Sequence, residues 1–216
     1  MQVPDAVRTL ARDLDAVFGK RLQCVVAYAR ADRLSGATPT LAVVDRVLPE
    51  DLAACAARVA AWHARGLDTP LILGAGEFAR SLDAFPFEFG AILADHAVVV
   101  GESPFDGLRV EPGDLRRACE VQARSHLLHL REGYLETSGR SDALADLIQR
   151  SARPLAALLN NLARLPGAHV VDETLREVVS HCAGGAIGAD EARRLLPAYL
   201  GALERLTADI DRWSVS

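Results

Sequence analysis

Several polar residues that could take part in binding or catalysis lie in the segment 22–45, around two Val-rich apolar runs. The joining segment contains Arg30 and Arg33, and two arginines in one loop could bind an anion through bidentate hydrogen bonds. Asp32 and Asp45 are the nearby acids. Neither has a second acid two residues away, the spacing that puts two carboxylates on one face of a strand. The ordinary interpretation is therefore a solvated loop with its acids on the surface.

A pair of hydroxyl residues, Thr38 and Thr40, opens the second apolar run. Residues i and i+2 of a strand point to the same face, so these two side chains would project together. Hydroxyl oxygens carry no charge and are weak ligands for Mg²⁺, a hard cation that prefers carboxylate oxygens. The residue types alone favour an ordinary junction between a loop and a strand.

The elements around these residues alternate in type over the first half of the chain. Apolar runs predict strands, and 3–4-residue apolar spacing predicts helices between them. Such alternation indicates an α/β domain. We expect helices over 4–18, 49–64 and 77–82, and strands over 22–28, 41–44, 71–73, 85–92 and 97–100.

The second half of the chain is predicted to be a helical bundle. A loop rich in Pro and Gly, 101–113, marks the boundary, giving domains 1–112 and 113–216. Helices are expected over 115–137, 142–165 with an interruption near Pro154, 170–182, and 189–213 with a kink or break at Pro197. One apolar stripe in this half, made of Leu155, Leu158, Leu159 and Leu162, is interpreted as intramolecular core. The alternative is a surface for self-association as a homodimer.

Composition narrows the function classes. The 216 residues are 50% hydrophobic and carry a net charge of −5, which argues against a surface built to bind nucleic acid. Four unpaired cysteines fit buried thiols in a reducing compartment. No apolar run approaches the roughly 18 residues of a membrane helix, and the N-terminus has no signal-peptide pattern. We expect a cytoplasmic protein with no membrane partner.

The order of these elements resembles the nucleotidyltransferase superfamily, in particular kanamycin-type nucleotidyltransferases, which have a mixed-sheet domain followed by a helical bundle. In that family the first strand ends in Tyr-Gly-Ser, and the next opens with Asp-x-Asp/Asn. Here the corresponding residues are Tyr28-Ala29-Arg30 and Thr38-Pro39-Thr40. The resemblance extends over about residues 5–136, including 79–89 and 115–135.

The resemblance implies a degenerate active site. The family's nucleotide and metal positions fall on Ala29, Arg30, Thr38 and Thr40, and Glu88 is the candidate for a vestigial third carboxylate. One carboxylate alone rarely holds a catalytic metal. The resemblance therefore implies an inactive protein without metal or cofactor, retaining a role in binding a small molecule or nucleotide, or in protein association.

Two alternatives remain open. The first is an active nucleotidyltransferase that uses Mg²⁺ with a nucleotide, held by Asp32, Asp45 and Glu88, and acts on a small molecule, protein or RNA. The second is a toxin–antitoxin-like or RNA-directed module, since HEPN-type ribonucleases carry Arg-x4–6-His on a helix. Arg124 and His129 match that pattern on a long predicted helix. About two such matches are expected by chance, so the pattern has little weight.

Overall fold

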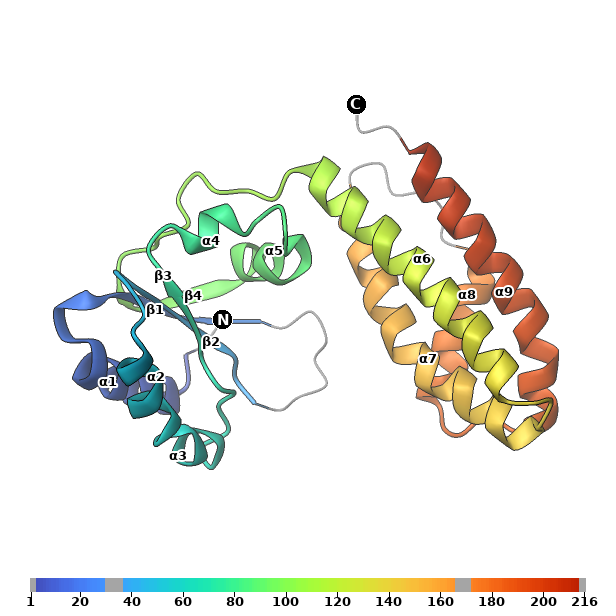
Figure 1. The fold of residues 1–216 in the computed structure, drawn as a ribbon, viewed down its shortest axis with the longest axis horizontal. Helices are drawn as coiled ribbons and strands as arrows, with labels where there is room; N and C mark the ends of the chain where they lie inside the picture. Colours follow the sequence, from blue (N-terminus) through green and yellow to red (C-terminus); the bar gives the residue numbers. More distant parts are fainter. Residues whose placement is uncertain (1–2, 30–36, 166–171, 214–216) are drawn as a thin grey trace. The chain divides into compact units, whose positions relative to one another are not determined.

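The structure is a computed structural model that describes residues 3–29, 37–165 and 172–213. The chain divides into two compact units, Met1–Val110 and Glu111–Ser216. Figure 1 shows a sheet flanked by helices in the first unit and long helices alone in the second. The expected fold class, an α/β domain followed by a helical bundle, is confirmed by these elements.

The first unit is built on a mixed four-stranded sheet with the order β3-β2-β1-β4. The central strand β1 pairs antiparallel with both β2 and β4, and β2 pairs parallel with β3. These strands agree with four of the five expected from the sequence. Their bounds are β1 Leu22–Tyr28, β2 Thr40–Val44, β3 Leu71–Gly74 and β4 His96–Gly101.

The two faces of the sheet are covered by different helices, because side chains alternate along each strand. One face, which we call the α1 face, carries Val25, Ala27, Ala42 and Val44, packed with residues of α1 and with Trp62. The opposite face, the α5 face, packs with α4 and α5 through a second cluster: Cys24, Val26, Leu41, Val43, Phe78, Phe89 and Ile92. The helices of this unit are α1 Asp5–Phe18, α2 Pro49–Ala56, α3 Val59–His63, α4 Glu77–Arg80 and α5 Pro86–Ala94.

The predicted strand over 85–92 is wrong, because this segment forms helix α5. The Phe residues at every second position suggested a strand. Pro86 instead occupies the first helical turn, where a missing N–H costs nothing. Phe89 and Ile92, three residues apart, are both buried on one side of the helix. The apolar spacing of a helix therefore overrides the local alternation.

The second unit consists of four helices in the part of the chain that the structure describes. They are α6 Pro112–Glu136, α7 Ser141–Leu162, α8 Glu173–Ala183 and α9 Ala189–Arg212. Pro154 and Pro197 lie inside α7 and α9, so the expected interruption near Pro154 is wrong. Proline removes one helical hydrogen bond, and the burial of Leu155 and Leu158 beside Pro154 offsets that loss.

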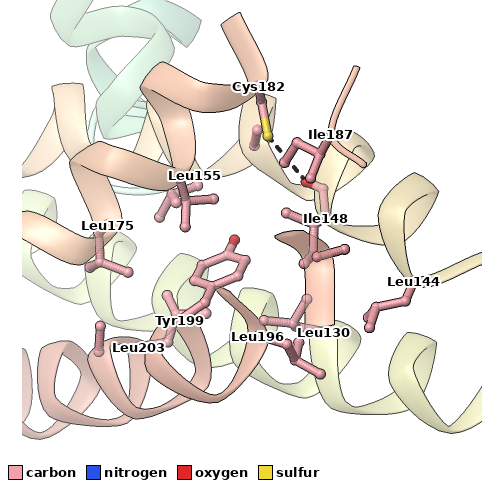
Figure 2. Packing of buried hydrophobic residues seen from close by; sticks show 14 of the residues in the cluster. Leu130, Leu144, Ile148, Leu155, Leu175, Cys182, Ile187, Leu196, Tyr199 and Leu203 are labelled. Atoms are coloured by element: carbon pink, nitrogen blue, oxygen red, sulfur yellow. Dashed lines mark hydrogen bonds between the residues drawn. The ribbon is translucent and has the colours of Figure 1, made fainter. Parts of the chain in front are cut away.

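The core of this unit contains the leucine stripe noted in the sequence. Leu155 and Leu158 are fully buried, and Leu162 is 6% exposed. Leu159 is partly buried and packs against the core shown in Figure 2. The interpretation as intramolecular core is confirmed, and this stripe offers no free surface to a second copy.

No helix in the described ranges is long and apolar enough to cross a bilayer.

Candidate functional site

Three of the predicted site residues meet at one end of the sheet, where β1 ends and β2 begins. Ala27 of β1 is the register partner of Thr40. The Tyr28 N–H donates to the Pro39 carbonyl (3.2 Å), and the Ala29 N–H donates to the carbonyl of Asp95 (3.0 Å). Ala29, Thr38 and Thr40 therefore lie at the same end of the sheet. Arg30, with Asp32 and Arg33, lies outside the described residues.

Thr38 is held by backbone bonds on the side of the sheet edge next to β3. It forms an isolated parallel bridge with Leu67. Its N–H donates to Gly66 (2.8 Å), and its carbonyl accepts from the N–H of Asp68 (3.0 Å). The half-buried Thr38 thus forms a separate parallel bridge beyond the β2–β3 pairing, which fits a structural role.

Thr40 is part of the core. The residue is 1% exposed, and its hydroxyl has no hydrogen-bond partner in the described part of the chain. Strand alternation puts its side chain on the α1 face with Ala42 and Val44. A buried hydroxyl without a partner costs about 1–3 kcal/mol. The position is therefore closed and apolar, and it offers no charge to a metal ion.

Glu88 is not brought to Thr40. It lies in the first turn of α5, exposed to solvent. The α5 helix packs on the face that carries Leu41 and Val43, whereas Thr40 belongs to the α1 face. The expectation that Glu88 stands on a neighbouring strand and shares a face with the threonines is therefore wrong. The reason is the helix that replaces the predicted strand.

The other candidate acid, Asp45, lies at the opposite end of β2. It is exposed and accepts a hydrogen bond from the side-chain amide of Gln23 (2.6 Å). A strand rises about 3.3 Å per residue, so the five steps from Thr40 to Asp45 span roughly 16 Å. Mg²⁺ needs its ligands at about 2.1 Å, so these two residues cannot share an ion.

Carboxylates are also missing from the sheet itself. None of the strands β1 to β4 contains Asp or Glu. Within 3–29, 37–165 and 172–213, no group of three or more His, Cys, Asp or Glu side chains is placed to hold a metal ion. Neither the strands nor such a ligand group in the described ranges therefore supplies the carboxylates that the family resemblance leads one to expect.

Two polar residues at this sheet end were not predicted as site residues. Tyr28 and His96 are register partners on β1 and β4. The Nδ1 of His96 lies 2.8 Å from the Ile92 carbonyl, which can only accept, so Nδ1 carries the proton. The neutral ring then presents Nε2 as an acceptor. The signal in the sequence was a histidine at the start of an apolar run, but its pairing with Tyr28 required the sheet order.

The Arg124 and His129 pair forms ordinary surface contacts. Arg124 bonds Glu120 (3.1 Å) and Asp211 (3.0 Å), and His129 lies 3.3 Å from Glu132. These side chains are about half exposed or more, except the Glu120 carboxylate at 23%. Both residues are engaged with acids of the helical unit, as is usual for solvated helix faces.

Comparisons with known proteins give a likeness to solved structures. No family model matches the sequence, and no curated protein matches it. Among solved structures, the crystal structure of spectinomycin adenyltransferase AAD(9) from Enterococcus faecialis, with ATP and spectinomycin, is similar to this chain. The similarity covers 96% of this chain and 99% of that one, with a TM-score of 0.48 and 10% sequence identity.

Proposed function

We propose that this chain is a nucleotidyltransferase-fold protein that does not transfer nucleotides and that retains its fold to bind a ligand or another protein. The observation that carries the proposal is the environment of Thr40. At a position where the family resemblance calls for a metal-binding carboxylate, this chain has a buried hydroxyl on the α1 face that has no hydrogen-bond partner among the described residues.

Nucleotide transfer depends on charge at this position. Metal ions must bridge the phosphates and neutralise the charge that develops in the transition state, and carboxylates hold those ions. The threonines supply no charge, Asp45 lies roughly 16 Å along the strand, and Glu88 is carried by the helix on the α5 face. The described acids do not replace the missing pair.

The packing around Thr40 supports the same conclusion. A residue that faces an apolar cluster should accept an apolar side chain of the same shape. Thr40→Val removes the unpaired hydroxyl and keeps the β-branched form, so we expect the free energy of unfolding to rise by about 1 kcal/mol. Thr38→Val is the matched control, because Thr38 is half-buried and lies two residues before Thr40, outside β2.

The test combines stability with ligand binding. Urea unfolding gives the free energy of unfolding of wild type, Thr40→Val and Thr38→Val. Calorimetric titration with ATP, GTP, CTP and UTP, with and without Mg²⁺, gives the affinity of each variant. We expect any nucleotide binding to be independent of Mg²⁺ and unchanged in Thr40→Val. Mg²⁺-dependent binding that Thr40→Val abolishes would instead contradict the proposal.

A further inference from the structure

Helix α6 has two apolar rows, and its own bundle covers only one of them. The covered row packs with α7 and α9 and consists of Leu115, Cys119, Ala123, Leu127 and Leu130. The second row, which we call the α6 stripe, consists of Val121, Leu128 and Leu135. Their side chains are 69%, 61% and 76% exposed, more than any other large hydrophobic side chain in the described ranges. A helix that packs only within its own bundle needs one apolar stripe, so the second one indicates a further contact.

The spacing of the α6 stripe is that of a coiled-coil seam. Its residues recur at every seventh position, and seven residues fall within about 20° of two full helical turns. The stripe therefore runs almost straight along about 21 Å of the helix. Ala118 and Ser125, each three residues before a stripe residue, occupy the other seam position of the heptad, where small side chains let a second helix approach closely. A second copy of this chain carries the same repeat and can therefore pack against it.

The charges beside the α6 stripe indicate how two copies would align. Placed on a helix with 100° per residue, one flank of the stripe carries three arginines, again seven residues apart: Arg117, Arg124 and Arg131. The other flank carries three acids and neither arginine nor lysine: Asp114, Glu132 and Glu136. In a parallel pair, the arginine flank of each copy faces the acidic flank of the other. In an antiparallel pair, the two arginine flanks face each other, so charge complementarity favours the parallel pair.

The arginine flank remains accessible although it is bonded within the chain. Arg117 bonds the aspartate three residues before it, Arg124 bonds Asp211 of α9 (3.0 Å), and Arg131 bonds Glu204 of α9 (2.6 Å). The side chains of Arg124 and Arg131 are still about half exposed. A guanidinium has five N–H donors, more than these contacts use, so a carboxylate of a second copy can be added. The bonds to α9 also hold both arginines in place before a partner arrives.

We propose that the α6 stripe is a homodimer surface, on which two copies of the chain pack α6 against α6 in parallel. Each stripe residue then faces its own counterpart, with Leu128 at the centre. One face of one helix provides less than the roughly 800 Å² per partner of a standard interface, so the dimer dissociates on dilution. The surface lies in the second unit, and the proposal does not depend on the chemistry at Thr40.

The first test is sedimentation equilibrium of the full chain, from about 1 μM to about 1 mM, which measures the association constant. We expect a monomer–dimer equilibrium in the wild type. Leu128→Glu places two like charges at the centre of the seam and should lower the association constant by about a hundredfold. Leu128 is exposed, so urea unfolding of the variant should match the wild type.

The matched control is Leu52→Glu, because Leu52 is a 50% exposed leucine on α2 of the first unit. This variant should associate as the wild type does. A wild type that stays monomeric over the whole range would overturn the proposal, including the case in which the first unit of the same chain covers the α6 stripe. A dimer that Leu128→Glu leaves intact would overturn it as well.

A second measurement tests the alignment and does not depend on the folding of Leu128→Glu. Leu135→Cys adds an exposed thiol at one end of the stripe, whereas the four native thiols are buried. In the parallel pair the two introduced thiols face each other, within the Cα distance of about 7 Å that a disulfide allows. In an antiparallel pair centred on Leu128 they would lie about 21 Å apart along the helices. Oxidised glutathione should therefore give a covalent dimer of Leu135→Cys and none of Leu52→Cys, and failure of Leu135→Cys to cross-link would refute the parallel dimer.

Discussion

The position of Thr40 could belong either to a catalytic site or to the hydrophobic core, and its contacts place it in the core. Its neighbours along the strand, Ala42 and Val44, belong to the same core cluster as α1 residues, and its hydroxyl has no hydrogen-bond partner in the ranges that the structure describes. Threonine has the same shape as valine, so a buried threonine lowers the free energy of unfolding mainly through its unpaired hydroxyl. An aspartate at this position would instead bury a charge in an apolar cluster.

The double change Thr38→Asp and Thr40→Asp tests this at the residue scale. We expect the free energy of unfolding to fall by about 3–5 kcal/mol, as for an uncompensated buried charge. Mg²⁺ or Mn²⁺ should not restore it, because Glu88 belongs to the opposite face of the sheet. Urea unfolding with and without metal measures the effect, and Thr38→Asp alone should cost less. Recovery specific to metal in the double variant would show that a third ligand does reach this point.

The two strands that flank Ala29, Thr38 and Thr40 could be predicted because both apolar runs are clear, whereas the family resemblance alone implied that these residues belong to one site. The sequence could not predict which face of the sheet carries Thr40. The face depends on how β1 and β2 pair in register and on which helices cover each face of the sheet. Both are set by contacts between residues that are distant in the sequence. Tyr28 and His96 escaped prediction as a pair for the same reason, since 68 residues separate them.

At the scale of elements, the strands were easier to predict than the short helices. Continuous Val-rich runs have few alternatives to a buried strand. The segment that became α5 offered both an alternating pattern through its Phe residues and a helical spacing through Phe89 and Ile92. Tertiary packing decided between them: the ring of Phe89 lies 4.7 Å from that of Phe78. Local propensity is a weak guide where packing can override it.

The end of β4 has a strict requirement for glycine. Gly101 has a φ of +78°, and a Cβ there would lie 1.9 Å from the Gln23 carbonyl oxygen on β1. Gly101→Ala should therefore lower the free energy of unfolding by about 1–3 kcal/mol for the backbone strain alone, and further for the displaced strand. Gly107→Ala is a matched control, because Gly107 has a φ of +77° and open space around its Cα. Equal losses of stability in the two variants would contradict the clash.

At the scale of the whole molecule, both units are built from small and aliphatic side chains, as a content of 5% aromatics requires. In the first unit, the core residues of the sheet come from alternate positions along its strands. In the second unit, they come from apolar stripes along the helices. The four cysteines follow this pattern: all are free and buried. Burial raises the pKa of the Cys119 thiol to about 12.

We expect these four thiols to react only slowly with thiol reagents as long as the chain is folded. The raised pKa of about 12 lowers the thiolate fraction of Cys119 at neutral pH roughly a thousandfold. With Ellman's reagent at neutral pH, we expect almost no reaction in the native protein and four thiols per chain in concentrated guanidinium. A thiol that reacts in the native protein at the rate of a small peptide would show that one of these sites opens readily.

The central position of β1 has a consequence for how the chain acquires its structure during synthesis. Its partner β2 follows closely, with Ala27 paired to Thr40, but its other partner β4 arrives late, with Tyr28 paired to His96. A growing chain therefore exposes one side of an apolar strand until β4 has left the ribosome. Closing that long loop is slow compared with local pairing. The nascent first unit is thus most exposed to wrong strand pairing in the interval before β4 has left the ribosome.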